Sequence, residues 1–333
     1  MPTIEDVARE AGVSTATVSR IIHNSSQVLP ETRRKVEEVI ERLNYHPNRL
    51  ARQFRTQRTG NILVLLPEPD NSFFHGIIAG IESVAAQQGY HVLIAATHND
   101  PAQITYYFEC LQQKQIDGII TFSAEIDPET LQKYASQFPI VAAIRYYQGM
   151  KVPNVTIDNR KAARDITSYL LNLGHRQVAC LAGDTDIILY RDRLDGFFDA
   201  MKERGLEADP SLIIRSDVSI ESGLDAAAKL LGAGVPFTGI VTCGDTMAIG
   251  AARALKNTGI KVPDDVAVTG IDDIPLSALF SPPLTTVRQP RRQIGIRCME
   301  KLLDLIEGRP LPNRQEVLPY ELVIRESSGN FIG

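Results

Sequence analysis

Apolar runs alternate with amphipathic stretches from residue 61 to residue 272, and this pattern restricts the fold of the chain more than any other feature. The first run, NILVLLP at 61–67, is continuously apolar, as expected of a parallel strand that is covered on both faces. An amphipathic stretch at 74–88 follows it, and the two patterns then recur in turn. The alternation predicts two doubly wound α/β subdomains, each built on a parallel sheet.

Three short helical patterns precede the alternation. Thr3 can cap the first helix, and Asp6 stands at the spacing of a capping box. Gly12 can end that helix and Ser14 can cap the second, so the turn between the two helices is very short. Such a turn sets two helices at a steep angle, which is the geometry of a helix-turn-helix unit. A third helix is predicted from about residue 30 to residue 43.

Positive charge is concentrated near the N-terminus of an otherwise acidic chain. Residues 1–60 carry ten Lys or Arg and seven Asp or Glu, although the whole chain has a formal net charge of -5. Arginines recur at positions 49, 52, 55 and 58, and no acidic residue occurs between Glu41 and Glu68. A basic stripe of this kind suits a polyanion such as nucleic acid. A solvated helix face is the alternative.

The second predicted helix has the composition of a helix that reads DNA. Its N-terminal end carries Thr15, Ala16 and Thr17, whose small side chains let a backbone enter the major groove. Arg20, about one turn later, can contact a guanine edge or a phosphate. The alternative is a three-helix bundle that binds protein. The cap, the short turn and the polar face of the second helix favour DNA binding over this alternative.

The first 60 residues resemble the DNA-binding head of the lactose/galactose repressor family of bacterial transcription regulators. The matching elements are the TIEDVA start, the GVSTATVSR turn and helix, the ETRRKV third helix and the NYHPN exit. Further blocks in the family's order, among them GHRQVACLAG, RDRLDGF and PPLTTVRQP, extend the resemblance over essentially the whole chain. Within the family, the sequence looks most similar to the cytidine and purine repressor-like members.

This resemblance implies a small all-α helix-turn-helix head and an α/β core like that of the periplasmic sugar-binding proteins. A DNA-binding domain is expected at 1–46, a hinge helix or linker at 47–60, and an effector-binding and dimerisation core at 61–333. Within the core, the N-subdomain is expected to comprise about 61–158 plus 290–318. The C-subdomain is expected to comprise about 159–288 plus 319–328.

The resemblance also implies a sequence-specific transcription regulator, acting as a repressor, that binds a pseudo-palindromic DNA operator as a homodimer. A small hydroxylated ligand in the cleft between the subdomains, a sugar or a nucleoside-like molecule, is expected to control DNA binding allosterically. The expected DNA-binding residues are Thr3, Ser14, Thr15, Ala16, Thr17, Ser19, Arg20, His23, Asn24, Tyr45, Asn48, Arg49, Ala51, Arg52, Phe54 and Arg55.

Phe54 departs from the family's pattern in the linker. In the family, a hinge helix enters the minor groove and the last residue of P-x-x-x-A-R-x-L, a leucine, wedges into the central base step. Here that pattern runs from Pro47 to Phe54, so the expected wedge is wider and aromatic. Packing between the two hinge helices of a dimer is the alternative role for this side chain.

Charged side chains are expected to meet the ligand at the ends of strands, because open α/β sheets bind ligands beyond the carboxyl ends of their strands. Asp158 ends NVTID and Asp272 ends VTGID, and Arg193 can offer a fork of donors to a hydroxyl-rich ligand. Helix capping or hinge hydrogen bonding is the alternative for the two aspartates. Phe73, Phe74, Asp158, Arg193 and Asp272 match effector-contacting positions in the family. The expected effector-binding residues are these five and Asp245.

Apolar side chains restrict the chemical classes of ligand that we expect in the cleft. Phe73 and Phe74 could stack on a ring, with core packing as the alternative, and only one of them is expected to face the ligand. The loop at 185–190 (TDIILY) is apolar where several relatives bring polar side chains to the effector. Val218 stands where purine-binding relatives have an aromatic that stacks on the base, so a purine is disfavoured. A pyrimidine nucleoside and a modified sugar stay open.

Other classes of protein lack support in the sequence. There is no apolar signal-peptide region and no run of about 18 apolar residues, so a cytoplasmic protein without a membrane span is expected. The four cysteines form no CxxC pair and the six histidines form no HxxxH pair, so neither a metal nor another cofactor is expected. Dinucleotide, Walker and nucleophile-elbow motifs are missing, so an enzyme is not expected.

The sequence leaves two alternative functions. A periplasmic-type solute-binding protein would have the same core, but it would need a signal peptide and would not carry the head. A regulator controlled by a phosphorylated carrier protein would need a partner surface on the first subdomain, around 291–301. That stretch is mixed in charge and gives no clear sign of such a surface.

Overall fold

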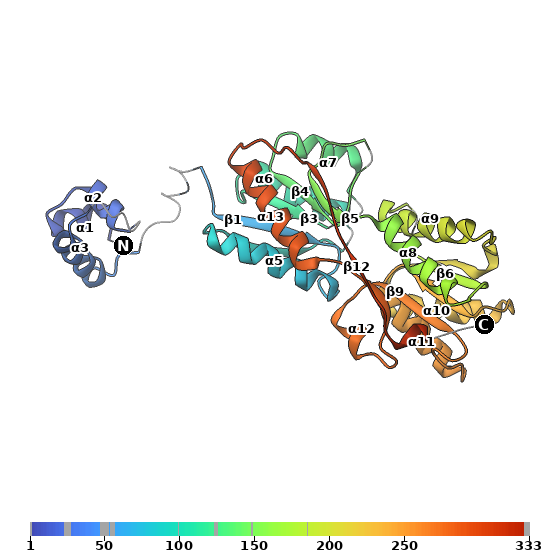
Figure 1. Cartoon of the computed structure of the whole chain (residues 1–333). Coiled ribbons are helices and arrows are strands. Elements are labelled where there is room, and N and C mark those ends of the chain that lie inside the picture. The colour runs from blue at the N-terminus through green and yellow to red at the C-terminus, as the bar shows by residue number, and fades with distance from the viewer. Residues whose placement is uncertain are drawn as a thin grey trace. The chain divides into compact units, whose positions relative to one another are not determined.

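The computed structural model describes residues 2–22, 28–46, 53, 57–98, 100–122, 126–147, 149–184 and 186–329. The chain divides into two compact units, Met1–Thr59 and Gly60–Gly333 (Figure 1). The first unit is all-α, and the second contains two six-stranded sheets. This is the fold class that the sequence predicts, and none of the helices in the described ranges is long and apolar enough to cross a membrane.

The first unit is a helix-turn-helix domain of three helices, α1 (Ile4–Ala11), α2 (Thr15–Ile22) and α3 (Pro30–Arg42). Thr3 and Asp6 form the capping box that their spacing predicts, with the Asp6 amide 3.3 Å from Thr3 Oγ1 and the Thr3 amide 2.9 Å from Asp6 Oδ2. Gly12 ends α1 in the left-handed conformation, with a φ of 67° that favours glycine. A small apolar core holds the three helices together.

The N-subdomain is built on a parallel sheet with the strand order β11-β5-β4-β3-β1-β2. Strand side chains point alternately to the two faces of the sheet. Helices α5 and α13 pack on one face, and α6 and α7 pack on the other. The strands are β1 (Asn61–Leu66), β2 (His91–Ala96), β3 (Gly118–Thr121), β4 (Ile140–Ala143), β5 (Asn154–Ile157) and β11 (Gln315–Leu318). The helices are α5 (Phe73–Gln87), α6 (Pro101–Gln112), α7 (Pro128–Ala135) and α13 (Arg291–Ile306).

The C-subdomain repeats this plan with the strand order β12-β10-β9-β8-β6-β7. Helices α8 and α9 pack on one face of its sheet and α10 and α11 on the other. The strands are β6 (Val178–Ala182), β7 (Ile213–Arg215), β8 (Gly239–Thr242), β9 (Ala267–Asp272), β10 (Thr285–Arg288) and β12 (Glu321–Val323). The helices are α8 (Asn159–Asn172), α9 (Ile188–Glu203), α10 (Ile220–Gly232), α11 (Asp245–Asn257) and α12 (Pro275–Leu279), with short 3-10 helices at Pro210–Leu212 and Glu326–Ser328.

Two details differ from the sequence-based expectation. β12 runs antiparallel to β10, although an all-parallel sheet is expected. The chain leaves β11 at the carboxyl end of the first sheet and enters the second sheet from its carboxyl end, so β12 must run against its neighbours. In addition, α9 begins at Ile188, so part of the expected loop at 185–190 belongs to the first turn of that helix.

Glycines bring the paired helices of each layer into close backbone contact. A Cβ on Gly295 of α13 would lie 2.0 Å from the Ile77 carbonyl oxygen of α5. A Cβ on Gly196 of α9 would likewise lie 2.1 Å from the Arg160 carbonyl oxygen of α8. A Cβ on Gly250 of α11 would lie 2.0 Å from the Ile220 carbonyl oxygen of α10. Real Cβ atoms do not approach this closely, so only glycine allows these crossings. Figure 1 shows α13 beside α5, although the two are far apart in the sequence.

Candidate ligand cleft and DNA-binding surface

A cavity of about 400 Å³ lies between the two subdomains, where the carboxyl ends of both sheets meet. Its lining comes from segments that follow β1, β4, β6, β7, β8, β9 and β10. The point between β1 and β3, and that between β6 and β8, are the places where the strand order reverses. Open α/β sheets bind ligands outside such points, so this cavity is the candidate ligand cleft.

Both phenylalanines at the start of α5 line the cleft, although the sequence leads us to expect only one there. The rings of Phe73 and Phe74 meet edge to face with centroids 5.6 Å apart, and Phe74 meets Phe122 in the same way at 5.2 Å. Both side chains are only 5% exposed and belong to the core of the N-subdomain. They therefore combine core packing with an aromatic cleft wall, and the two interpretations do not exclude each other.

Arg193 lines the cleft, but its guanidinium is already engaged by the protein. Its Nε donates to Asn159 Oδ1 at 2.9 Å, its Nη1 donates to the Cys243 carbonyl oxygen, and its Nη2 lies 3.4 Å from Asp272 Oδ1. Because α9 starts at Ile188, Arg193 lies in the second turn of the helix and does not open it. The fork of donors that the sequence suggests is therefore largely used by acceptors of the protein itself, which are Asn159, the Cys243 carbonyl and Asp272.

Asp272 is a cleft residue on a strained backbone. Its φ of 134° is uncommon for a side chain other than glycine, and Asp273 follows with a φ of 49°. Gln289 Nε2 donates to Asp272 Oδ1 at 2.7 Å. Burial raises the pKa of the Asp272 carboxyl above its ordinary value, and the positive charge of Arg193 acts in the opposite direction. The sequence-based placement of this carboxylate at the cleft agrees with its position in the structure.

Asp245 does not reach the cleft, contrary to expectation. Its carboxylate is fully buried and accepts hydrogen bonds from Ser277 Oγ at 2.6 Å, Thr286 Oγ1 at 2.5 Å and the Ile274 amide at 3.0 Å. These donors tie the start of α11 to α12 and β10. Burial, together with the charge of Asp272, raises the pKa of Asp245 to about 7.

Asp158 is the second expected cleft residue that the structure places elsewhere. It caps α8, where its Oδ1 accepts from the Lys161 amide at 2.9 Å, and it is solvent-exposed. It lines a shallow surface depression with Arg160 and Asp199 and does not line the cleft. Capping, the alternative weighed for this residue, is the role that the geometry supports.

The structure adds a cation that the sequence did not single out. Arg145 follows β4, is 8% exposed and lines the cleft. Next to it, the hydroxyl of Tyr146 donates to Asp192 Oδ2 of α9 at 2.7 Å, which joins the two subdomains at the cleft. The position of Arg145 just beyond the carboxyl end of a strand is the signal that could have identified it.

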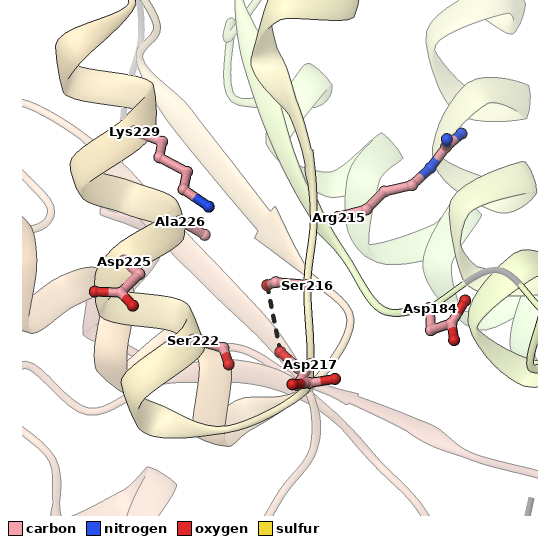
Figure 2. A pocket seen from close by; sticks show the side chains of 8 residues that line it. All are labelled: Asp184, Arg215, Ser216, Asp217, Ser222, Asp225, Ala226 and Lys229. Atoms are coloured by element: carbon pink, nitrogen blue, oxygen red, sulfur yellow. Dashed lines mark hydrogen bonds between the residues drawn. The ribbon is translucent and has the colours of Figure 1, made fainter.

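The rim of the cleft leads to a second pocket of about 400 Å³ (Figure 2). It lies between α10 and the segment that follows β7, and Asp184 lines it from the segment after β6. Asp184 and Asp217 line both this outer pocket and the cleft. The remaining lining residues are Arg215, Ser216, Ser222, Asp225, Ala226 and Lys229.

The helix-turn-helix unit presents a polar surface at the start of α2. Ser14, Thr15, Ala16 and Arg20 are exposed, and Ser14 Oγ accepts from the Thr17 amide at 3.1 Å, which caps the helix. Thr3 is also exposed, and Thr17 and Ser19 are half-buried. The expected DNA contacts His23, Asn24, Asn48, Arg49, Ala51, Arg52, Phe54 and Arg55, and with them most of the expected hinge helix, lie outside the described residues.

Tyr45 is buried, unlike the other expected DNA contacts among the described residues. It is 8% exposed and packs in the core of the head, where burial raises the pKa of its hydroxyl. Its ring therefore supports the fold of the head rather than an open DNA-binding surface. No group of three or more potential metal ligands occurs in the described parts of the chain.

A helix-turn-helix head together with a two-lobed core of this topology defines a class of DNA-binding regulators with a sugar-binding type of domain. Residues 3–48 match the lacI family of bacterial regulatory proteins. Residues 59–325 match the periplasmic binding proteins and sugar binding domain of the LacI family. The chain belongs to the LacI family of transcription regulators.

Relatives of known function agree with this assignment. The chain is 36% identical to the HTH-type transcriptional repressor CytR of Escherichia coli (strain K12), over 98% of this chain and 96% of that protein. It is 38% identical to the HTH-type transcriptional regulator DegA of Bacillus subtilis (strain 168), over 98% of each. These relatives are regulators and not enzymes, and the chain is a DNA-binding transcription regulator of the same kind.

Solved structures give the same result. The lac repressor dimer bound to operator and the anti-inducer ONPF has a TM-score of 0.88 with 29% identity, over 98% of this chain and 99% of that chain. The complex of the transcriptional regulator CelR with cellobiose has a TM-score of 0.75 with 32% identity, over 98% of this chain and 100% of that chain.

Proposed function

We propose that the chain is a cytoplasmic homodimeric repressor whose affinity for a pseudo-palindromic operator is set by a small hydroxylated molecule in the cleft. The observation that carries this proposal is the cleft itself, which both subdomains line at the carboxyl ends of their sheets. A ligand that contacts both walls has a different affinity for open and closed cores. It can therefore shift the core between two states, and through them the DNA-binding heads.

Direct DNA reading is assigned to α2. Thr15, Ala16 and Thr17 are small and start the helix, and Arg20 is exposed one turn further on. Side chains of this kind reach base edges when a recognition helix lies in the major groove. We assign the expected hinge arginines to phosphate contacts and Phe54 to the minor-groove wedge.

The ligand is assigned to the class of sugars and nucleoside-like molecules. Phe73 and Phe74 offer faces or edges to a ring, and Arg145, Asp272 and Gln289 offer polar groups to hydroxyls. One structural relative is titled as a complex with cellobiose, which is a hydroxyl-rich ligand of that protein. Because the wall around Ile187 is apolar, the ligand has a less polar side at that end.

The dimer surface is assigned to the β2 edge of the N-subdomain. β2 is the last strand of its sheet, and Leu93 and Ile94 are 44% and 50% exposed there. An unpaired edge strand with exposed apolar side chains is a surface that proteins normally cover. One structural relative is titled as a dimer bound to its operator.

Control by a carrier protein finds less support. The expected partner stretch, 291–301, falls on α13, which packs against α5. Lys301 is only 4% exposed and pairs with Glu316 at 3.0 Å. Arg292 and Gln293 are exposed, so one side of α13 is open to a partner, but its side chains are mixed in charge and give no clear sign of such a contact.

The experiment that tests the proposal has two stages. Nucleosides, sugars and sugar phosphates are first screened for a shift in the melting temperature of the protein. Each hit is then added to a binding assay with an operator selected from a randomised duplex library. We expect a neutral hydroxylated hit to change operator affinity; a change produced only by a carrier protein would reject the cleft assignment.

A further inference from the structure

The turn at residues 144–146, directly after β4, has a strained backbone. Ile144 has a φ of 61°, in the left-handed region, where a β-branched residue is a genuine outlier. The neighbouring strand β5 holds it there: the Ile144 amide donates to the Val155 carbonyl oxygen at 2.8 Å, and the Ile144 carbonyl oxygen accepts from Thr156 Oγ1 at 3.1 Å. Strain of this kind persists where the surroundings fix it, and it occurs at ligand-binding and switch segments.

The turn sends its next two side chains to different places. Arg145 lines the cleft, whereas the hydroxyl of Tyr146 donates to Asp192 Oδ2 of α9 at 2.7 Å. Among the described residues, the cleft lining includes neither Tyr146 nor Asp192. Burial and this hydrogen bond raise the pKa of Tyr146 to about 12, so its hydroxyl keeps the proton that it donates. A rotation about the φ of Ile144 would move both following residues, so the two contacts depend on one backbone turn.

The hydrogen bond between Tyr146 and Asp192 joins the subdomains away from the places where the chain crosses between them. Those crossings connect β5 with α8, β10 with α13, and β11 with β12. The contact from Arg291 Nη2 to the Asp273 carbonyl oxygen lies beside the second crossing. Tyr146 follows β4 and Asp192 lies in the second turn of α9, so no crossing segment holds these two residues together. Their contact can therefore open while the crossings stay in place.

Apolar side chains make a second kind of contact between the subdomains. Ile249 of α11 and Ile274, both from the C-subdomain, are buried in the same apolar cluster as Phe73 and Phe74 of the N-subdomain. Separating these side chains would expose apolar surface to water, which is unfavourable. Water can replace either partner of the Tyr146 hydrogen bond at a small net cost. The hydrogen bond is therefore the contact that opens more easily.

We propose that the turn at 144–146 is a latch: Ile144 holds Arg145 in the cleft lining and Tyr146 on Asp192 at the same time, and so couples the cleft to the contact between the subdomains. This inference rests on the proposed function, because it concerns how the same core changes conformation. Tyr146 and Asp192 are positioning residues, since they set the balance between open and closed cores without lining the cleft. Operator affinity therefore depends on their hydrogen bond even when no ligand is bound.

Two measurements on the full-length, ligand-free protein test the latch. Hydrogen exchange reports local opening, and Tyr146→Phe should speed exchange about threefold or more in peptides that cover 141–147 and 188–193. Binding to an operator selected from a randomised duplex library reports the effect on DNA. Tyr146→Phe and Asp192→Ala should each change the operator Kd about threefold or more, in the same direction. The double variant should change it no further, because each substitution removes the same contact.

Tyr169→Phe is the matched control, because the Tyr169 hydroxyl lies 3.2 Å from Ser328 Oγ within the C-subdomain. It should change neither exchange in these peptides nor operator affinity. Ile144→Asn should slow exchange of 141–147, since asparagine adopts the left-handed conformation more readily. Unchanged exchange in Tyr146→Phe, or faster exchange with an unchanged operator Kd, overturns the latch and leaves the repressor proposal standing. A wild-type protein that selects no operator overturns the repressor proposal, and exchange alone then decides the latch.

Discussion

Two buried carboxyl groups, of Asp245 and Asp272, form the electrostatic centre of the C-subdomain. Asp272 faces the cleft and is held by Arg193 and Gln289, whereas Asp245 lies beneath it and links α11 with α12 and β10. Each carboxylate makes ionisation of the other less favourable. Since only Asp272 has a cationic partner, we infer that Asp272 carries the charge and that Asp245 holds its proton to a higher pH than an ordinary carboxyl group does.

This assignment predicts a pH dependence of stability. Burial raises the pKa of Asp245 to about 7, so the folded chain keeps a proton that the unfolded chain releases near pH 4. The contribution of Asp245 to the free energy of unfolding is therefore complete below about pH 4 and is lost as the pH rises through about 7. Asp245→Asn cannot ionise, so the variant should gain stability relative to wild type between these limits.

Urea unfolding at pH 4.5, 6 and 8 measures this difference. Asp264→Asn, at an exposed carboxylate, serves as the matched control and should leave the pH dependence unchanged. Parallel stability curves for wild type and Asp245→Asn would show that Asp245 is ionised throughout this range.

Close crossings of helix pairs determine how the helices of the core pack against one another. α5 and α13 come from opposite ends of the core sequence, yet Gly295 brings their backbones together over the first sheet. The same arrangement joins α8 with α9 and α10 with α11. Because cores are packed densely, a single methyl group at such a crossing forces the helices apart.

Gly295→Ala should therefore destabilise the core by about 2 kcal/mol, since overpacking of this kind forces backbone shifts. Gly232→Ala is the matched control, because a Cβ at this last residue of α10 meets nothing within 4 Å. That change should be neutral or should stabilise the chain by about 0.5 kcal/mol through its effect on the unfolded state. Chemical denaturation of both variants measures the two values, and equal stability of the two would contradict the crossing argument.

Strands and helices could be predicted from the sequence because their patterns are local. The apolar runs of β1 and β9 and the cap of α1 each depend on a few neighbouring residues, and the structure confirms them. The direction of β12 was not predictable in this way, because it depends on how the chain crosses between the sheets. Local patterns also gave no sign of the glycine crossings.

The candidate site could be predicted only in part, for the same reason. Phe73 and Phe74 begin α5, Asp272 ends β9 and Arg193 lies near the start of α9, and the structure places all four in the cleft lining. Asp245 also follows a strand, but α12 folds over it and removes it from the cleft. Whether a carboxylate at the end of a strand meets a ligand or a neighbouring helix depends on tertiary packing.

The proposed homodimer needs a surface on each chain that the other chain covers. The β2 edge with Leu93 and Ile94 is our dimer surface, and β11 forms the opposite edge of the same sheet. Replacing both Leu93 and Ile94 with Glu should raise the dimer dissociation constant at least tenfold, because it places charges in an apolar contact. Sedimentation of the variant at micromolar concentration measures this change.

Val317→Glu is the control for that prediction. Val317 is 61% exposed on β11, so the substitution places a negative charge of the same kind at the opposite edge. It should leave the dimer intact. A dimer that persists in the β2 variant, or dissociates in the β11 variant, would move the interface away from β2.

In the proposed mechanism, contacts between the two subdomains let a cleft ligand act on the heads. The Tyr146–Asp192 hydrogen bond joins them beside Arg145 and Arg193, and Arg291 Nη2 of α13 donates to the Asp273 carbonyl oxygen at 2.9 Å. A ligand that binds between the subdomains shifts the equilibrium between core conformations in which these contacts are formed and conformations in which they are broken. Because coupling is reciprocal, a ligand that weakens operator binding is itself bound more weakly by the DNA complex.

The most direct test of this account is the fluorescence anisotropy of a labelled operator duplex, titrated with the dimer with and without a saturating cleft ligand. We expect the ligand to change the operator Kd about tenfold or more and to change the Kd for unrelated duplex DNA much less. We also expect Arg145→Gln to need more ligand to reach the same change. An operator Kd that stays the same at saturating ligand would contradict the account.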